Sequence, residues 1–132
     1  MLATAPHRRS LPRSRRSVNF KFEINNLDES YLTVGEYEDG CPGEIFIRAA
    51  KQGSTLAGVM DALSAAVSLG LQHGVPLSEF VKEYQGTKFE PAGATNWPEL
   101  PTCSSIIDLI FRHLARHYLA SEERKRLGLS PS

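Results

Sequence analysis

The sequence predicts an α+β domain in which a three-stranded antiparallel meander is covered by two to three α-helices. Two observations support this prediction. Three short segments with strand-like alternation follow one another in the first half of the chain, separated by turn-forming residues. Helical periodicity dominates the second half. At 132 residues the chain has the length of a single domain.

The three strands are predicted at residues 18–24, 31–37 and 44–48. In the first, the apolar residues Val18, Phe20, Phe22 and Ile24 alternate with polar ones, as in a half-buried strand. The third places Ile45 and Ile47 on one side and Phe46 on the other. Short turns join the strands, so we expect an antiparallel meander whose apolar face needs a cover.

Three helices are predicted after the sheet. The longest starts at Ser54 or Thr55, either of which could cap it, and stops at Gly74. Its many small residues favour burial against a sheet or a second helix, and it is the expected cover of the sheet. A second helix begins near Pro76 and ends by Gly86.

The third helix extends to about Ala120, with Thr102 or Ser104 as the expected cap. Residues 87–101 between the last two helices are irregular, and we expect burial of Phe89 and Trp97 to hold them in place. The predicted division is a basic flexible arm at 1–17, one domain at 18–120 and a flexible tail at 121–132.

Charge is unevenly distributed along a chain whose net charge is zero. The first 21 residues contain six Arg or Lys residues, Arg15 and Arg16 among them, and no acid. This arm could be a transit peptide or a nucleic-acid contact. The favoured interpretation is a solvated linker that folds back on the acidic remainder of the chain. No run of about 18 apolar residues predicts a membrane span, and we expect a cytoplasmic protein.

Reactive chemistry is not indicated by any motif. Cys41, in a turn, and Cys103, at a helix start, are expected to be free thiols. His113 and His117 lie on one helical face and are expected at the surface. A divalent-cation site is weighed against ordinary solvation for four acidic residues around the second turn, and solvation is favoured: Glu36, Glu38, Asp39 and Glu44. We therefore assign no catalytic, cofactor-binding or metal-binding residue.

Several segments together carry a family likeness. They are LPRSRRSVNFKFEI, YLTVGEYEDGCPGEIFI, AAKQGSTLAGVMDALSAAVSLGLQHGVPLSEFV, TKFEP and SIIDLIFRHLA. In this order and spacing the chain resembles a region near the C-terminus of adenosylcobalamin-dependent (class II) ribonucleotide reductases. That region is related to the small domain named after a TSCPD motif, although the motif itself is absent here.

The resemblance implies a role in converting ribonucleotides to deoxyribonucleotides for DNA synthesis. The family's catalytic barrel, with its radical-forming cysteine and its cobalamin and nucleotide sites, lies upstream of the matching region. We therefore expect this chain to bind no adenosylcobalamin. It would be an accessory or interaction domain that binds the catalytic reductase chain or a second copy of itself as a homodimer.

Nine residues are the candidates for contact with such a partner, selected from the strand start, the helix start, the fixed turn before Gly93 and the arm: Gly43, Glu44, Gly53, Ser54, Phe89, Glu90, Pro91, Arg15 and Arg16. Two alternatives stay open. One is a stand-alone nucleotide- or nucleic-acid-binding module that uses the arginine arm. The other is an enzyme with a reactive thiol at Cys41.

Overall fold

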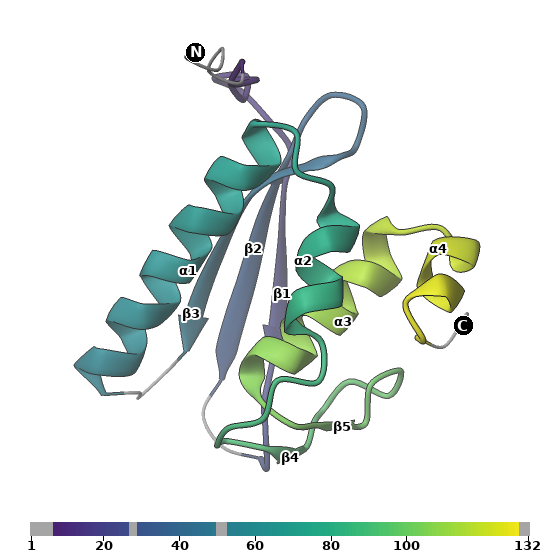
Figure 1. The fold of residues 1–132 in the computed structure, drawn as a ribbon. Coiled ribbons are helices and arrows are strands. Elements are labelled where there is room, and N and C mark those ends of the chain that lie inside the picture. The colour runs from purple at the N-terminus through teal and green to yellow at the C-terminus, as the bar shows by residue number, and fades with distance from the viewer. Residues whose placement is uncertain (1–6, 27–28, 50–52, 130–132) are drawn as a thin grey trace, which may run out of the picture.

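A computed structural model describes residues 7–26, 29–49 and 53–129. Strands β1 (Ser17–Phe22), β2 (Ser30–Glu36) and β3 (Pro42–Ala49) form one antiparallel sheet in the order β1-β2-β3 (Figure 1). Helices follow the sheet, so the predicted α+β class is confirmed. Each predicted strand lies within two residues of its observed bounds.

The register of the sheet places one apolar row on its inner face. Phe20 lies opposite Leu32, which in turn lies opposite Ile47. Leu32 and Ile47 are buried, whereas Phe46 on the outer face has 56% of its surface exposed. The predicted alternation along β3 is therefore confirmed, and the Phe46 ring lies exposed on the outer face of the sheet in the described part of the chain.

Four helices are described. Helix α1 spans Ser54–Gln72, α2 spans Leu77–Tyr84, α3 spans Ile106–Tyr118 and α4 spans Ser121–Arg126. The cap predictions were partly wrong. Gly53, which has no side chain, is the N-cap of α1, and the Ser105 hydroxyl caps α3 by accepting from the Asp108 N–H. Gly74 ends α1 with a φ of +91°, as predicted.

Helix α1 does not cover the sheet as expected. It lies alongside β3, at the edge that the strand order leaves unpaired (Figure 1). The Ile45 N–H donates to Ser68 Oγ at 2.9 Å, and Gln72 Nε2 donates to the Gly43 carbonyl at 2.9 Å. Side chains of α1 thus take the place of a fourth strand, because a sheet edge must pair its backbone groups or protect them.

The apolar face of the sheet packs against α3 at the β1 side. The ring of Phe20 on β1 contacts that of His113 on α3 with centroids 4.3 Å apart. Met60 and Val67 of α1 and Val81 of α2 complete the same core. The largest fully buried apolar side chains come from all three strands and from three helices: Phe22, Phe111, Leu32, Ile45, Leu109, Ile110, Leu114, Val34, Val67 and Val81.

The segment between α2 and α3 is better ordered than its sequence indicates. Strands β4 (Gly93–Ala94) and β5 (Thr102–Cys103) pair, and Thr95 forms a bridge with Ile24. Trp97 donates its Nε1–H to the Lys21 carbonyl at 2.9 Å. Both Phe89 and Trp97 pack against the core, so the expected aromatic burial is confirmed.

Helix α4 lies within the stretch predicted to be a flexible tail. Its sequence suits a short helix, since Glu122 and Glu123 occupy the first turn and the basic residues occupy the last. Leu127 and Leu129 beyond it pack partly against the core. The sequence analysis did not predict this element.

Candidate interaction surface

Residues of the basic arm lie against acidic side chains of the sheet. Arg15 forms an ion pair with Glu44 on β3, and Arg16 Nε lies 3.6 Å from Glu36 Oε1 at the end of β2. The Glu36 N–H donates to the Arg16 carbonyl at 2.9 Å, which extends the ladder between β1 and β2 by one residue. The arm therefore continues the sheet before it crosses the body of the domain.

Glu36 is the buried acid at this junction, with a side chain only 8% exposed. Tyr118 on α3 donates its hydroxyl to Glu36 Oε2 at 2.6 Å. Burial, and then the hydrogen bond to this carboxylate, raise the pKa of Tyr118 above its usual value. Glu36 thus links the arm, the sheet and the end of α3.

Further along the arm, Arg9 lies over Tyr37, with the guanidinium carbon 3.8 Å from the ring centroid. Arg9 also pairs with Asp39 at 3.3 Å, and its carbonyl accepts the Tyr37 hydroxyl at 2.6 Å. A Cβ on Gly43 would lie 2.7 Å from both Leu11 and the Tyr37 ring. Glycine at this position is what allows the arm to pass.

The candidate partner-binding residues divide into three places. Gly43, Glu44, Arg15 and Arg16 lie close to one another where the arm meets the sheet; Arg15 pairs with Glu44 and Arg16 with Glu36 of the same chain. Gly53 and Ser54 stand at the start of α1. The structure does not unite the nine residues into one surface.

The last three, Phe89, Glu90 and Pro91, lie between α2 and β4. Phe89 is half-buried against the core, and its N–H donates to the Ser104 carbonyl at 3.1 Å. Glu90 is exposed and Pro91 half-buried. This segment is part of the packed loop that leads to α3.

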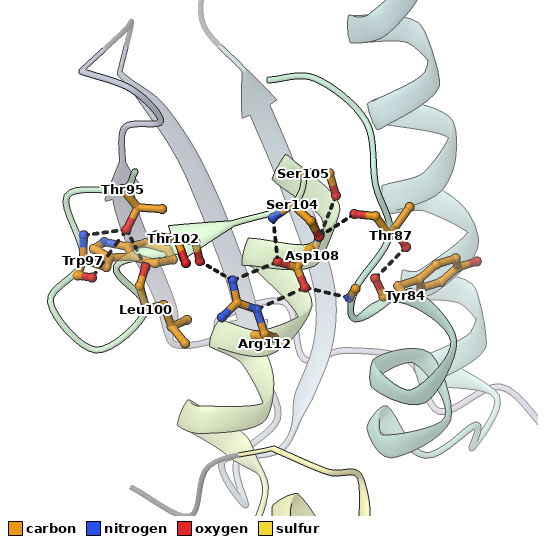
Figure 2. Close-up of polar contacts among 11 residues, drawn as sticks. Tyr84, Thr87, Thr95, Trp97, Leu100, Thr102, Ser104, Ser105, Asp108 and Arg112 are labelled. Carbon is orange, nitrogen blue, oxygen red and sulfur yellow. Dashed lines mark hydrogen bonds and ion pairs between the residues drawn. The ribbon is translucent and has the colours of Figure 1, made fainter. Parts of the chain in front are cut away.

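Figure 2 shows the polar network at the start of α3. Asp108 is buried and accepts from the Gly86 N–H at 2.6 Å, from the Ser104 N–H at 3.1 Å and from Arg112 Nη2 at 2.8 Å. Burial alone would raise the pKa of Asp108, but these donors hold it below its usual value. Arg112 also donates to the Thr102 carbonyl. Each of these donors bonds to an acceptor within the chain, so the network joins the loop after α2 and the segment before α3 to helix α3 itself.

The expected surface position of the two helical histidines is wrong for His113. Its ring lies 4.2 Å from that of Trp97, and Nε2 is buried without a hydrogen-bond partner among the described residues. Burial, with the neighbouring His117 as a second cause, lowers the pKa of His113 to about 4. His117 is exposed as expected. The predicted surface position fails for His113 because the ring of Trp97, in the loop between β4 and β5, lies against the imidazole.

Metal and thiol chemistry find little support in the geometry. In the described ranges no group of three or more His, Cys, Asp or Glu residues could hold a metal ion. Cys41 is exposed and Cys103 is buried, and neither is in a disulfide. Burial raises the pKa of both thiols, and a hydrogen bond with Asp39 adds to the effect at Cys41. A raised thiol pKa lowers the thiolate fraction, which is the reactive form.

The surface that the sequence analysis missed is the outer side of α1. This helix was expected to be buried, yet only 22% of the residues in its segment Thr55–Gln72 are buried. That segment is also the one described helix long and apolar enough to cross a bilayer, which is weak evidence by itself. The sequence contained a signal, because apolar residues surround α1 on all sides instead of following one stripe.

Beside this face lies a groove of about 430 Å³ between α1 and the outer side of β3. Phe46, Ala65 and Leu69 supply its apolar wall, and Arg8, Glu44 and Asp61 stand among its polar lining residues. Among the described residues, fold and surface together define a small α+β domain with an internally bonded polar network and an exposed apolar face on α1.

Comparison with known proteins identifies the family. The TSCPD domain family matches residues 5–118, and the chain belongs to this family. The match includes most of the basic arm. No solved structure matches the chain at a significant level.

Similar proteins include several named vitamin B12-dependent ribonucleotide reductase. The chain is 46% identical over 124 residues to one from Streptantibioticus cattleyicolor, which covers 94% of this chain and 20% of that protein. It is 42% identical over 118 residues to one from Rhodopirellula baltica, covering 89% of this chain and 11% of the relative. It is 40% identical over 124 residues to one from Agrobacterium fabrum, covering 93% of this chain and 10% of that protein. The chain thus spans a fifth or less of these relatives.

Proposed function

We propose that this chain is an accessory domain of a vitamin B12-dependent ribonucleotide reductase system and does not carry out the reduction itself. The observation that carries the proposal is the extended identity to such reductases across nearly the whole chain, which nevertheless covers only 10–20% of those proteins. The partner would be the catalytic reductase chain, in the cytoplasm. A second copy of the chain, as in a homodimer, is the alternative partner to this proposal.

The polar groups support a scaffold role. Asp108 and Glu36, the buried acids, have structural hydrogen-bond partners. A catalytic acid or base must instead reach a substrate proton within hydrogen-bond distance. The pockets of about 320–490 Å³ among the described residues are of a size typical for small ligands, which supports a chain that binds no adenosylcobalamin. We propose that the cofactor binds to the catalytic chain.

The nucleic-acid alternative has less support. Phosphate contacts require free Lys or Arg side chains. Arg9, Arg15 and Arg16 all contact acidic groups of the same chain. An arm engaged in this way would have to exchange internal ion pairs for phosphates.

Affinity capture from the source cells tests the proposal. The intact chain is immobilised, and retained proteins are identified by mass spectrometry. We expect recovery of a vitamin B12-dependent ribonucleotide reductase that stays bound at moderate salt. Recovery of nucleic acid that elutes steeply with salt, or of this chain alone, would contradict the proposal.

A further inference from the structure

Two large apolar side chains flank the groove between α1 and β3. Phe46 on β3 is 56% exposed and Leu69 on α1 is 46% exposed. The small Ala65, also on α1, lines the same groove. Exposed Leu or Phe residues are ordinary when scattered singly. Here two of the four exposed large apolar residues among the described residues line one groove, so the pattern is that of a patch.

The patch continues along α1. On the side of this helix away from the core, the exposed residues are mostly apolar, with Thr55 and Asp61 as the polar exceptions among them: Thr55, Ala57, Gly58, Val59, Asp61, Ala62, Ala65, Ala66 and Leu69. Side chains this small allow a second backbone to approach closely. A solvent-facing helix normally presents charged residues on this side.

One polar group at the groove also lacks a hydrogen-bond partner among the described residues. Ser64 lines it, is 4% exposed, and its hydroxyl has no hydrogen-bond partner among the described residues. Its helical neighbour Ser68 is by contrast bonded to Ile45 on β3. A buried hydroxyl without a partner costs free energy, and a docked chain could supply the missing acceptor or donor after a small rotation.

A bilayer is a poor occupant for this face. Helix α1 is fixed to β3 through Ser68 and Gln72, and insertion would break these bonds. Asp61 would enter the hydrocarbon. The comparisons point to protein instead, because the relatives carry 80–90% of their length outside the matching segment. A domain that forms a tenth to a fifth of a chain has a large polypeptide beside it.

We infer that the face formed by Phe46, Ala65, Leu69 and the exposed side of α1 is the surface through which the domain docks on the catalytic part of a vitamin B12-dependent ribonucleotide reductase. The inference rests on the proposed function and adds the contact surface to it. The complementary segment is apolar at its centre, to fill the groove. It is polar at its ends, where it meets Arg8, Glu44 and Asp61.

Two substitutions test the surface. Phe46→Thr removes the exposed ring and keeps a strand-favouring residue. Ala65→Arg places a bulky charge in the groove from an exposed helical position. Each is made in the full chain, and binding to the purified reductase recovered by the capture is measured by biolayer interferometry. We expect each to raise Kd by about tenfold or more.

Val75→Thr is the matched control, because Val75 is also an exposed aliphatic residue but does not line the groove. We expect its Kd to stay within about twofold of wild type. Circular dichroism and urea unfolding check that all variants are folded.

The outcomes separate the two proposals. If wild type binds the reductase and both variants bind equally well, the docking surface is wrong and the proposed function stands. If wild type fails to bind any reductase, both are wrong. If light scattering shows a wild-type dimer that Phe46→Thr and Ala65→Arg convert to monomer while reductase binding is unchanged, a second copy covers the face and the inference is overturned.

Discussion

At the scale of single residues, Asp108 holds more of the fold together than any other polar side chain in the described part. It is the third residue of α3, and its own N–H is capped by Ser105 Oγ at 3.0 Å. Its carboxylate then accepts from Gly86 in the loop after α2 and from Ser104 in the turn between β5 and α3. One carboxylate thus ties the loop after α2 to the start of α3.

Replacing Asp108 with Ala should therefore lower the free energy of unfolding by about 2–4 kcal/mol, because two partly buried N–H groups and Arg112 lose their acceptor. Urea unfolding followed by circular dichroism measures the loss. Glu79→Gln on the exposed side of α2 is the control and should change stability by less than about 0.5 kcal/mol. Equal stability of Asp108→Ala and wild type would falsify this account of the network.

His113 gives the protein a specific pH dependence. Its pKa is about 4 in the folded chain and 6.5 in the reference state. Between these values the unfolded chain binds the proton and the folded chain does not, so stability falls as pH is lowered from about 6.5 to 4. The gap corresponds to roughly 3 kcal/mol, fully lost below pH 4. His117, Arg116 and Glu99 are the charged neighbours that modify it.

The measurement is the urea midpoint at a series of pH values for wild type and His113→Phe. Phenylalanine keeps a ring against Trp97 and cannot titrate. We expect the variant to lose the additional decline between pH 6.5 and 4, whereas His117→Phe, at an exposed position, should retain it. An NMR titration in which the His113 ring shows a pKa near 6.5 would contradict the buried, neutral imidazole.

At the scale of elements, the pairing of α1 with β3 is the feature that distinguishes this fold from a sheet with helices on one face. Ser68 Oγ accepts from the Ile45 N–H at 2.9 Å and donates to its carbonyl at 3.3 Å. Gln72, buried in the structure, bonds the Gly43 carbonyl. These bonds occupy backbone groups of Gly43 and Ile45 on an edge that would otherwise be a template for another strand.

Ser68→Ala should thus leave the Ile45 N–H without its acceptor, and the expected loss is about 1–3 kcal/mol. Hydrogen exchange gives the more direct readout, since the Ile45 amide should lose protection while the amides of β1 keep theirs. Ser78→Ala on α2, a half-buried serine away from the sheet edge, is the control. Unchanged protection at Ile45 would show that the edge is stabilised in some other way.

The sequence predicts the elements of this fold better than their arrangement. Strand positions follow from local alternation. The side chains of Phe20, Phe22, Ile45 and Ile47 lie on the same face of the sheet, as expected. The placement of α1 depends on two side chains reaching the backbone of another element. The burial of His113 depends on Trp97. Neither contact leaves a local pattern, so periodicity cannot reveal it.

For a similar reason, sequence patterns do not indicate what surrounds the candidate partner-binding residues. Gly43 and Glu44 were chosen as partner-facing, yet the chain's own arm occupies their surroundings. A sequence shows that a charged side chain is present but not which side chain of opposite charge it pairs with in the fold. Phe46 was recognised as facing outward, but its meaning depends on the uncovered helix beside it.

At the scale of the whole molecule, the arm acts as a strap over one end of the domain. Arg9 donates its N–H to the Gln72 carbonyl at 2.8 Å, close to the C-terminal end of α1. Arg16 meets the buried Glu36, which also accepts from Tyr118 on α3. The strap therefore contacts the sheet and both long helices, and the family match extends over it.

Deleting residues 1–16 should lower the urea midpoint, because Glu36 loses its cationic partner while it stays in contact with Tyr118. The remaining loss should come from the backbone bonds of Arg9 and Arg16. In the deletion variant, Glu36→Gln should recover part of the stability that the deletion removes, since a neutral amide needs no counter-charge.

The full chain and the deletion variant are compared at low and moderate salt, with and without duplex DNA. We expect the deletion to cost stability at both salt concentrations, because the backbone bonds are not screened, and we expect DNA to stabilise neither protein. A DNA-dependent rise in the midpoint that requires residues 1–16 and disappears with salt would instead assign the arm to phosphate contacts, since only a ligand that binds the folded arm shifts the unfolding equilibrium in this way.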